Sequence, residues 1–111
     1  MTKYMAMYMA SKPVIDQMMK ATPEQMKSGM DAWMAWSKKN AKAIVELGAP
    51  LGKTKHVDKT GVSDTKNEIT GYSIVQADSF DAAAKIFKDH PHLGMAGAWI
   101  DLLECVSIPG M

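Results

Sequence analysis

The stretch EITGYSIVQADSFDAAAKIF, residues 68–87, predicts a strand followed directly by a helix. Residues 68–77 are rich in β-branched and aromatic side chains, which favour a strand. Asp78 and Ser79 then offer side-chain oxygens that can cap the first turn of a helix. Apolar side chains follow at the spacing of one buried helix face: Phe80, Ala83, Ala84 and Phe87. Pro91 ends this predicted helix at about His90.

A second strand and helix are predicted upstream. Residues 3–10 alternate in side-chain size in the manner of a strand, and both faces of that strand are apolar. Residues 14–20 favour a turn or so of helix. Thr22, Pro23 and Gln25 then form the start of a long helix, with a capping hydroxyl, a proline in the first turn and a capping-box partner. We expect this helix to end at Gly48, where a left-handed residue is followed by Pro50.

The long helix is predicted to be amphipathic over its whole length. An apolar stripe recurs at three- and four-residue spacing: Met26, Met30, Trp33, Met34, Ser37, Ala41 and Ile44. We expect Trp33 to lie in the core between helix and sheet, and Trp36 at a dimer contact or the surface. The alternative is that both indoles line an apolar pocket for an aromatic ligand.

Two further strands complete the predicted sheet. Residues 51–57 favour a strand, and the polar segment 58–67 around Gly61 favours an irregular hairpin leading into residues 68–77. Residues 96–108 alternate as a last strand, with Ile100 and Leu102 on one face and Trp99 and Leu103 on the other. The resulting order is strand, helix, strand, strand, helix, strand.

This order predicts an α+β fold of the ferredoxin-like, split βαβ type (βαββαβ). Right-handed crossovers place both helices on one face of a four-stranded antiparallel sheet. The other face then lacks a cover, although residues 3–10 are apolar on both sides. We therefore expect the protein to form a homodimer through its sheet faces.

Composition limits the classes of function. A chain of 111 residues fits one domain, residues 1–111, and its net charge of +1 is spread along the chain, so we expect no nucleic-acid partner. No apolar run reaches about 20 residues, so we expect no membrane span. The single cysteine gives no sign of an oxidising compartment, and a cytoplasmic location is the default expectation.

Four short motifs resemble those of the YCII-related proteins, including their DGPF-like branch. They are KYM at 3–5, MDAWMAW at 30–36, GYSIVQADSF at 71–80 and HPHL at 90–93. The resemblance spans nearly the whole chain and implies a dimeric α+β barrel, in which two ferredoxin-like sheets face one another with small clefts between sheet and helices.

The same resemblance implies an acid–base activity in some relatives. A few such proteins resemble dehydrochlorinases with a His and Asp pair, whereas most have no assigned reaction. This chain departs from that pattern, because the long helix has no histidine where Met30 or a neighbour stands, and His90 precedes the proline where some members have Asp. The DGPF segment is absent as well, since residues 64–70 read DTKNEIT.

The candidate catalytic residues are His90 and His92, which flank Pro91 on a rigid corner. An imidazole there can act as a general acid or base near neutral pH. The structural alternative is that a histidine after a helix caps loose carbonyl groups. A metal site formed with His56 lacks a third ligand at a recognisable spacing, and we predict no metal and no cofactor.

The candidate substrate-binding residues are Tyr8, Met30, Trp33 and Tyr72. The two tyrosine hydroxyls would orient a ligand if their strands are neighbours, while Met30 and Trp33 would supply apolar walls. The alternative for each of the four is ordinary packing.

Two functions follow from these residues. The first is a small-molecule acid–base enzyme, a lyase or hydrolase acting on a cyclic or aromatic substrate through a histidine in a cleft between sheet and helices. The second is a non-catalytic homodimeric ligand-binding or accessory domain. The two functions differ in whether an imidazole reaches an open cavity.

Overall fold

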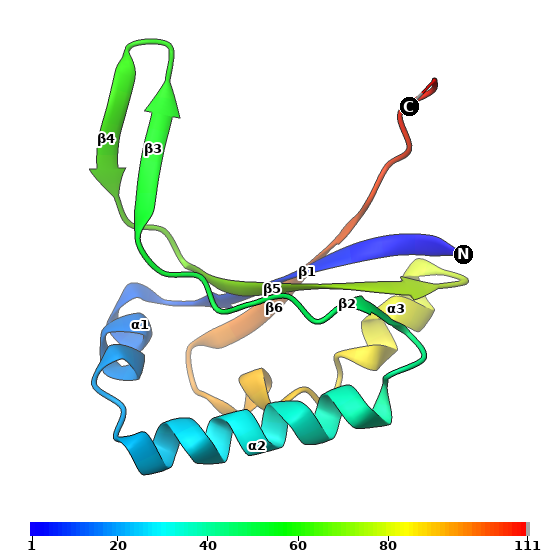
Figure 1. The fold of residues 1–111 in the computed structure, drawn as a ribbon, viewed down its shortest axis with the longest axis horizontal. Helices are drawn as coiled ribbons and strands as arrows, with labels where there is room; N and C mark the ends of the chain where they lie inside the picture. Colours follow the sequence, from blue (N-terminus) through cyan, green and yellow to red (C-terminus); the bar gives the residue numbers. More distant parts are fainter. Residues whose placement is uncertain (111) are drawn as a thin grey trace.

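A four-stranded antiparallel sheet forms the centre of the structure, a computed structural model that describes residues 1–110 (Figure 1). Its strands lie in the order β2, β5, β1 and β6. They comprise β2 (Ile44–Glu46), β5 (Ile69–Ala77), β1 (Thr2–Ala10) and β6 (Ala98–Glu104). This arrangement confirms the predicted α+β fold with a four-stranded antiparallel sheet.

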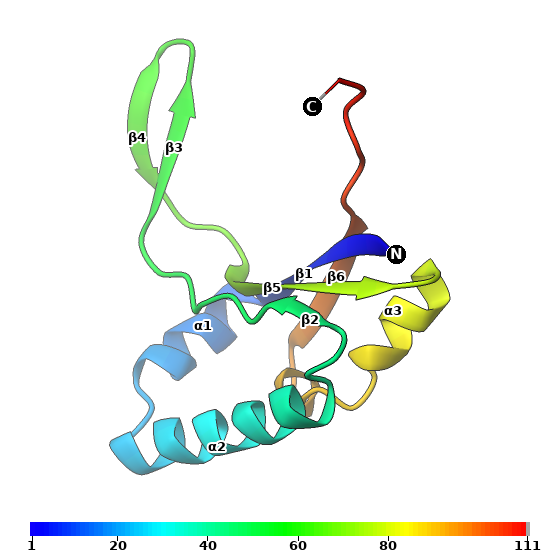
Figure 2. The same cartoon turned by 45° about the vertical axis from the view of Figure 1, so that its right-hand side comes forward.

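Three helices lie on one side of this sheet (Figures 1 and 2). They are α1 (Lys12–Met19), α2 (Pro23–Lys39) and α3 (Phe80–Ile86), and a short 3₁₀ turn, η1 (Pro91–Gly94), precedes β6. The capping box of α2 is confirmed: the Thr22 hydroxyl accepts the Gln25 N–H at 3.1 Å, and the Gln25 side chain accepts the Thr22 N–H at 2.9 Å. The predicted Ser79 cap of α3 is confirmed too, since its oxygen accepts from the Ala82 N–H.

Helix α2 ends earlier than predicted. It stops at Lys39 and not at Gly48, because the Asn40 side-chain amide donates to the Trp36 carbonyl and the chain then turns. Ile44–Glu46 leave the helical path and form the edge strand β2 against β5. Gly48 does have the predicted positive φ, 81°, but it lies after a strand, where it passes close to the backbone of β5.

The prediction of a sheet strand over residues 51–57 was wrong. Apart from an isolated bridge between Pro50 and Gly71, this segment leaves the sheet. Thr54–Asp58 form β3, which pairs with β4 (Gly61–Thr65) as a separate hairpin that projects from the body (Figure 1). Its side chains are almost all exposed, so the hairpin gains little from burial, and β2 already occupies the edge of the sheet next to β5.

Two other predicted elements are shorter than expected. Strand β6 ends at Glu104 rather than residue 108, because its partner β1 begins at Thr2 and the last bond joins the Cys105 N–H to the Lys3 carbonyl. Helix α3 ends at Ile86, and a turn carries the chain to His90. The helix predicted as about one turn within residues 14–20 is longer than expected, because α1 has eight residues.

The core lies between the sheet and the helices. Alternate residues of β1 and β5 point toward the helices and are buried: Tyr4, Ala6, Tyr8, Ala10, Ser73, Val75 and Ala77. Trp36 of α2 and Ala83 and Phe87 at α3 cover them. Among the described residues no helix is long and apolar enough to cross a bilayer.

The opposite face of the sheet has no cover within residues 1–110. The side chains on this bare face are half-buried or exposed. Most are apolar (Met5, Met7, Met9, Tyr72, Ile74, Trp99 and Leu103), and Lys3, Gln76 and Asp101 lie on the same face. The β3–β4 hairpin and the C-terminal segment both rise on this side of the sheet, near its two ends (Figure 1). The bare face therefore lies between the projecting β3–β4 hairpin and the C-terminal segment (Figure 1).

Candidate functional site

His90 lies in the core of the protein. It precedes η1, and its Nδ1 accepts the backbone N–H of His92 at 3.0 Å, which fixes the ring on the corner before Pro91. The side chain is only 2% exposed. Its ring is packed among the aromatic side chains of Trp36, Trp33 and Tyr8, with centroid separations of 4.4, 4.5 and 4.8 Å.

The proton of neutral His90 is held on Nε2. Because Nδ1 accepts a backbone N–H, Nδ1 cannot carry the proton of the neutral ring. Nε2 is buried and has no hydrogen-bond partner within residues 1–110. Burial lowers the pKa of His90 to about 4, and the nearby His92 lowers that pKa further, while Asp89 opposes the shift. The imidazole is therefore neutral at physiological pH.

His92 is also internal. Its Nε2 lies 2.7 Å from the Met9 carbonyl, so this nitrogen donates to the end of β1 and ties η1 to the sheet. The side chain is 5% exposed. Both candidate catalytic imidazoles therefore make internal contacts, and neither lines the hollow beside α1 or the one beside α3.

Tyr8 belongs to the same cluster through its ring. Its hydroxyl donates to Ser73 Oγ at 2.7 Å, and Ser73 donates in turn to the Leu47 carbonyl at 2.6 Å. Burial raises the pKa of Tyr8 to about 12, although the Ser73 hydrogen bond opposes this shift. This buried chain of hydrogen bonds joins β1, β5 and the segment after β2, so the Tyr8 hydroxyl already has a hydrogen-bond partner inside the protein.

Trp33 packs against the core between α2 and the sheet, as predicted, but the prediction of a surface or dimer contact for Trp36 was wrong. Trp36 is the buried one, and its indole N–H donates to the Ile86 carbonyl at 3.0 Å. Trp33 is half-buried and stands at 89° to the His90 ring. The reason is that α2 touches the rest of the protein chiefly near its C-terminal end, so the residue nearest that end enters the core.

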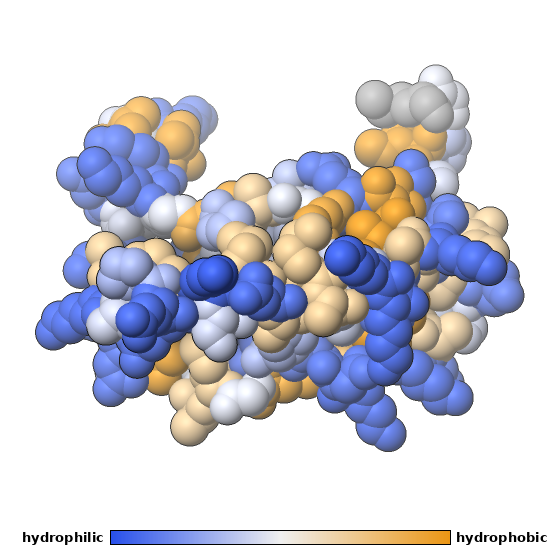
Figure 3. Space-filling view, turned by 60° about the horizontal axis from the view of Figure 1, so that its bottom comes forward, coloured by the Kyte–Doolittle hydropathy of each residue, from blue (hydrophilic) through white to orange (hydrophobic). Residues whose placement is uncertain are grey.

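Met30 and Tyr72 lie outside this cluster. Met30 is 55% exposed on α2, and the surface on the helical side shows apolar residues interspersed with hydrophilic ones (Figure 3). Tyr72 lies on the bare face of the sheet, where its hydroxyl donates to Glu46 Oε1 at 2.6 Å. That hydrogen bond raises the pKa of Tyr72. The structure thus brings Tyr8, Trp33, His90 and His92 together and leaves Met30 and Tyr72 apart.

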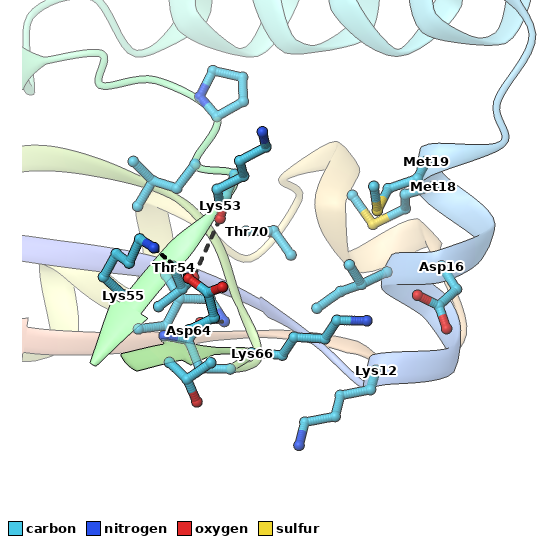
Figure 4. Close-up of a pocket in the computed structure, with 17 residues that line it drawn as sticks. Lys12, Asp16, Met18, Met19, Lys53, Thr54, Lys55, Asp64, Lys66 and Thr70 are labelled. Atoms are coloured by element: carbon cyan, nitrogen blue, oxygen red, sulfur yellow. Dashed lines mark hydrogen bonds and ion pairs between the residues drawn. The ribbon is translucent and has the colours of Figure 1, made fainter. Parts of the chain in front are cut away.

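A large hollow lies elsewhere, between α1 and the base of the β3–β4 hairpin (Figure 4). This hollow, called the α1 cleft below, has a volume of about 900 Å³. None of the six sequence-predicted site residues lines it. Its walls come from three separate segments, residues 12–19, 50–55 and 64–70, so no local spacing in the sequence points to the site. His56 lies on the hairpin near this cleft but pairs with Asp58.

No protein-family model matches the chain, and no curated protein matches it.

Proposed function

We propose that this protein is a non-catalytic, homodimeric ligand-binding domain. The observation that supports the proposal best is the position of the two imidazoles. His90 and His92 are buried in a packed aromatic cluster, and each is oriented by a contact with the backbone. A general acid or base must reach the proton that it transfers, and these rings face protein atoms instead.

The proposed dimer is a ferredoxin-like pair with the two sheets face to face. The strand order β2, β5, β1, β6, with α2 joining β1 to β2 and α3 preceding β6, supports the ferredoxin-like assignment. The bare face supports the pairing, because apolar side chains along the middle of a sheet gain free energy when a second sheet covers them. The projecting hairpin and C-terminal segment would then flank the second copy.

The acid–base enzyme is the second candidate, and one observation favours it. The Nε2 of His90 is a buried polar atom without a hydrogen-bond partner among the residues that the structure describes, and such atoms are uncommon outside functional or strained sites. A lyase or hydrolase of this kind would need the C-terminal end of α2 to move, because Trp33 and Trp36 enclose the ring.

Modification with diethyl pyrocarbonate distinguishes the two functions. This reagent acylates accessible neutral imidazoles, and the chain provides an internal standard in His56, which is exposed on the hairpin. For a non-catalytic domain we expect His56 to react while His90 and His92 react only after unfolding in urea. Peptide mass mapping reads all three positions. Reaction of native His90 at the rate of His56 would contradict the proposal and favour the enzyme.

The dimer is tested by sedimentation at several protein concentrations. We expect a species of twice the monomer mass that dissociates on dilution. A monomer at all concentrations up to the millimolar range would exclude the face-to-face pairing.

A further inference from the structure

We propose that the α1 cleft binds a small amphipathic carboxylate, with its apolar body against α1 and its carboxylate among the lysines at the cleft's rim. This inference rests on the proposed ligand-binding function and names both the site and the chemical class of the ligand.

The cleft has the size of a ligand site. Its volume of about 900 Å³ falls within the range of roughly 300–1,000 Å³ typical of small-molecule pockets. It lies at the junction of a helix and a hairpin base, where chain segments distant in sequence meet. The hollow is therefore large enough for a ligand of ten or more non-hydrogen atoms.

Two facing walls of the cleft carry apolar side chains that are exposed or half-buried. Ile15, Met18 and Met19 come from α1, and Pro50, Leu51 and Ile69 face them from the sheet side. Met19 is 80% exposed and Leu51 is 45% exposed, although both are large apolar side chains. An apolar ligand body would remove this surface from water, and flexible thioethers adapt to the shape of different chains or rings.

The charge of the lining favours an anion. Four lysines and two aspartates line the cleft, which leaves an excess of two positive charges. Lys55 is paired with Asp64, whereas Lys12, Lys53 and Lys66 make no ion pair within residues 1–110. In the close-up, Lys66 extends from the end of β4 toward α1 (Figure 4). The unpaired ammonium groups therefore outnumber Asp16, the remaining acid.

The kind of positive charge favours a carboxylate over a phosphate. The chain has no arginine, so the rigid two-pronged contact that often holds phosphate is missing, and lysines act as point charges. A single carboxylate needs one or two such charges. Asn67 can add a neutral donor, because its side-chain oxygen accepts the Ile69 N–H and leaves the amide hydrogens to donate.

The test is an NMR titration of the full chain with octanoate, using n-octanol as the uncharged ligand of matched length. We expect octanoate to shift the amide signals of Ile15, Met18 and Ile69, and to bind at least fivefold more tightly than n-octanol. Raising the NaCl concentration from 50 to 500 mM should weaken octanoate binding and leave n-octanol binding nearly unchanged.

Two triple variants with the same change in net charge test whether octanoate binds at the α1 cleft. Replacing Lys12, Lys53 and Lys66 by glutamine should weaken octanoate binding about tenfold, since exposed charges contribute modestly one by one. The matched control replaces Lys27, Lys42 and Lys59, which are exposed and lie outside the cleft, and should change affinity less than twofold.

Three outcomes would overturn the inference: equal affinity in the two triple variants, equal binding of octanol and octanoate, or shifts confined to the bare face of the sheet. These results leave the proposed function standing if the dimer persists and His90 resists acylation. Octanoate-dependent shifts at the ring of His90 would instead count against the non-catalytic domain.

Discussion

Acidification from pH 7.5 to pH 4.5 should destabilise the fold through His90. The folded protein holds the pKa of His90 at about 4, whereas the unfolded chain has the ordinary value of 6.5. Between these two values the unfolded state binds more protons than the folded state, so stability falls as the pH falls. Because of this difference in proton binding, the free energy of unfolding at pH 4.5 should be about 2.5 kcal/mol lower than at pH 7.5.

The control variant is His90→Asn. The asparagine oxygen can take the place of Nδ1 and accept the His92 N–H, so the cap is kept while the titrating group is removed. We expect this variant to be less stable than the unmodified protein at pH 7.5, because it leaves space among the tryptophans. Its stability should nevertheless change little between pH 7.5 and 4.5.

Urea unfolding at fixed protein concentration, repeated at half-unit pH steps, measures the effect. Two aspartates also have lowered pKa values: Asp58 through hydrogen bonds from Thr60, and Asp89 through the hydrogen bond from Lys39. Their contributions are lost mainly as the pH falls below about 4, so they change little within the measured window. If the unmodified protein and His90→Asn lose the same stability between pH 7.5 and 4.5, the conclusion that His90 is a buried, neutral imidazole is refuted.

Three further predictions concern single side chains. Gly48→Ala should cost about 2 kcal/mol or more, because a Cβ there would lie 1.8 Å from a backbone oxygen of β5, whereas Gly52→Ala meets nothing within 4 Å; thermal unfolding compares them. Ser73→Ala should cost about 1–3 kcal/mol in urea unfolding by interrupting the buried hydrogen-bond chain, and a neutral result would contradict its structural role. Met7→Lys should shift the sedimenting species to monomer, unlike Met26→Lys on α2; a dimer in both variants would exclude the bare face as the interface.

Local signals in the sequence predicted those elements that depend on a few neighbouring residues. The strand at residues 69–77, the Ser79 cap and the Thr22 capping box were found because β-branched runs and capping side chains act within one turn or one strand. The end of α2 was missed because apolar side chains at helical spacing continue through Ile44. That residue instead pairs with Val75, which lies 31 positions later in the chain.

The candidate site also combines features that local sequence patterns predict with features that depend on long-range packing. The sequence pointed to His90, His92, Tyr8 and Trp33, and the structure places these four side chains in one cluster. Sequence patterns do not report whether such a cluster is open to solvent, since that depends on how α2 approaches the sheet. The cleft lysines had no signal at all, because they come from segments that only the folded chain brings together.

The sequence by itself therefore determined the class of fold, the first turns of two helices and the apolar character of both faces of β1, because propensity, capping and alternation are local properties. Tertiary structure alone decided which strand occupies the edge beside β5, which tryptophan enters the core and how deeply the histidines are buried. Each of these depends on competition among distant segments for the same surface, and that competition is resolved by packing and by long-range hydrogen bonds.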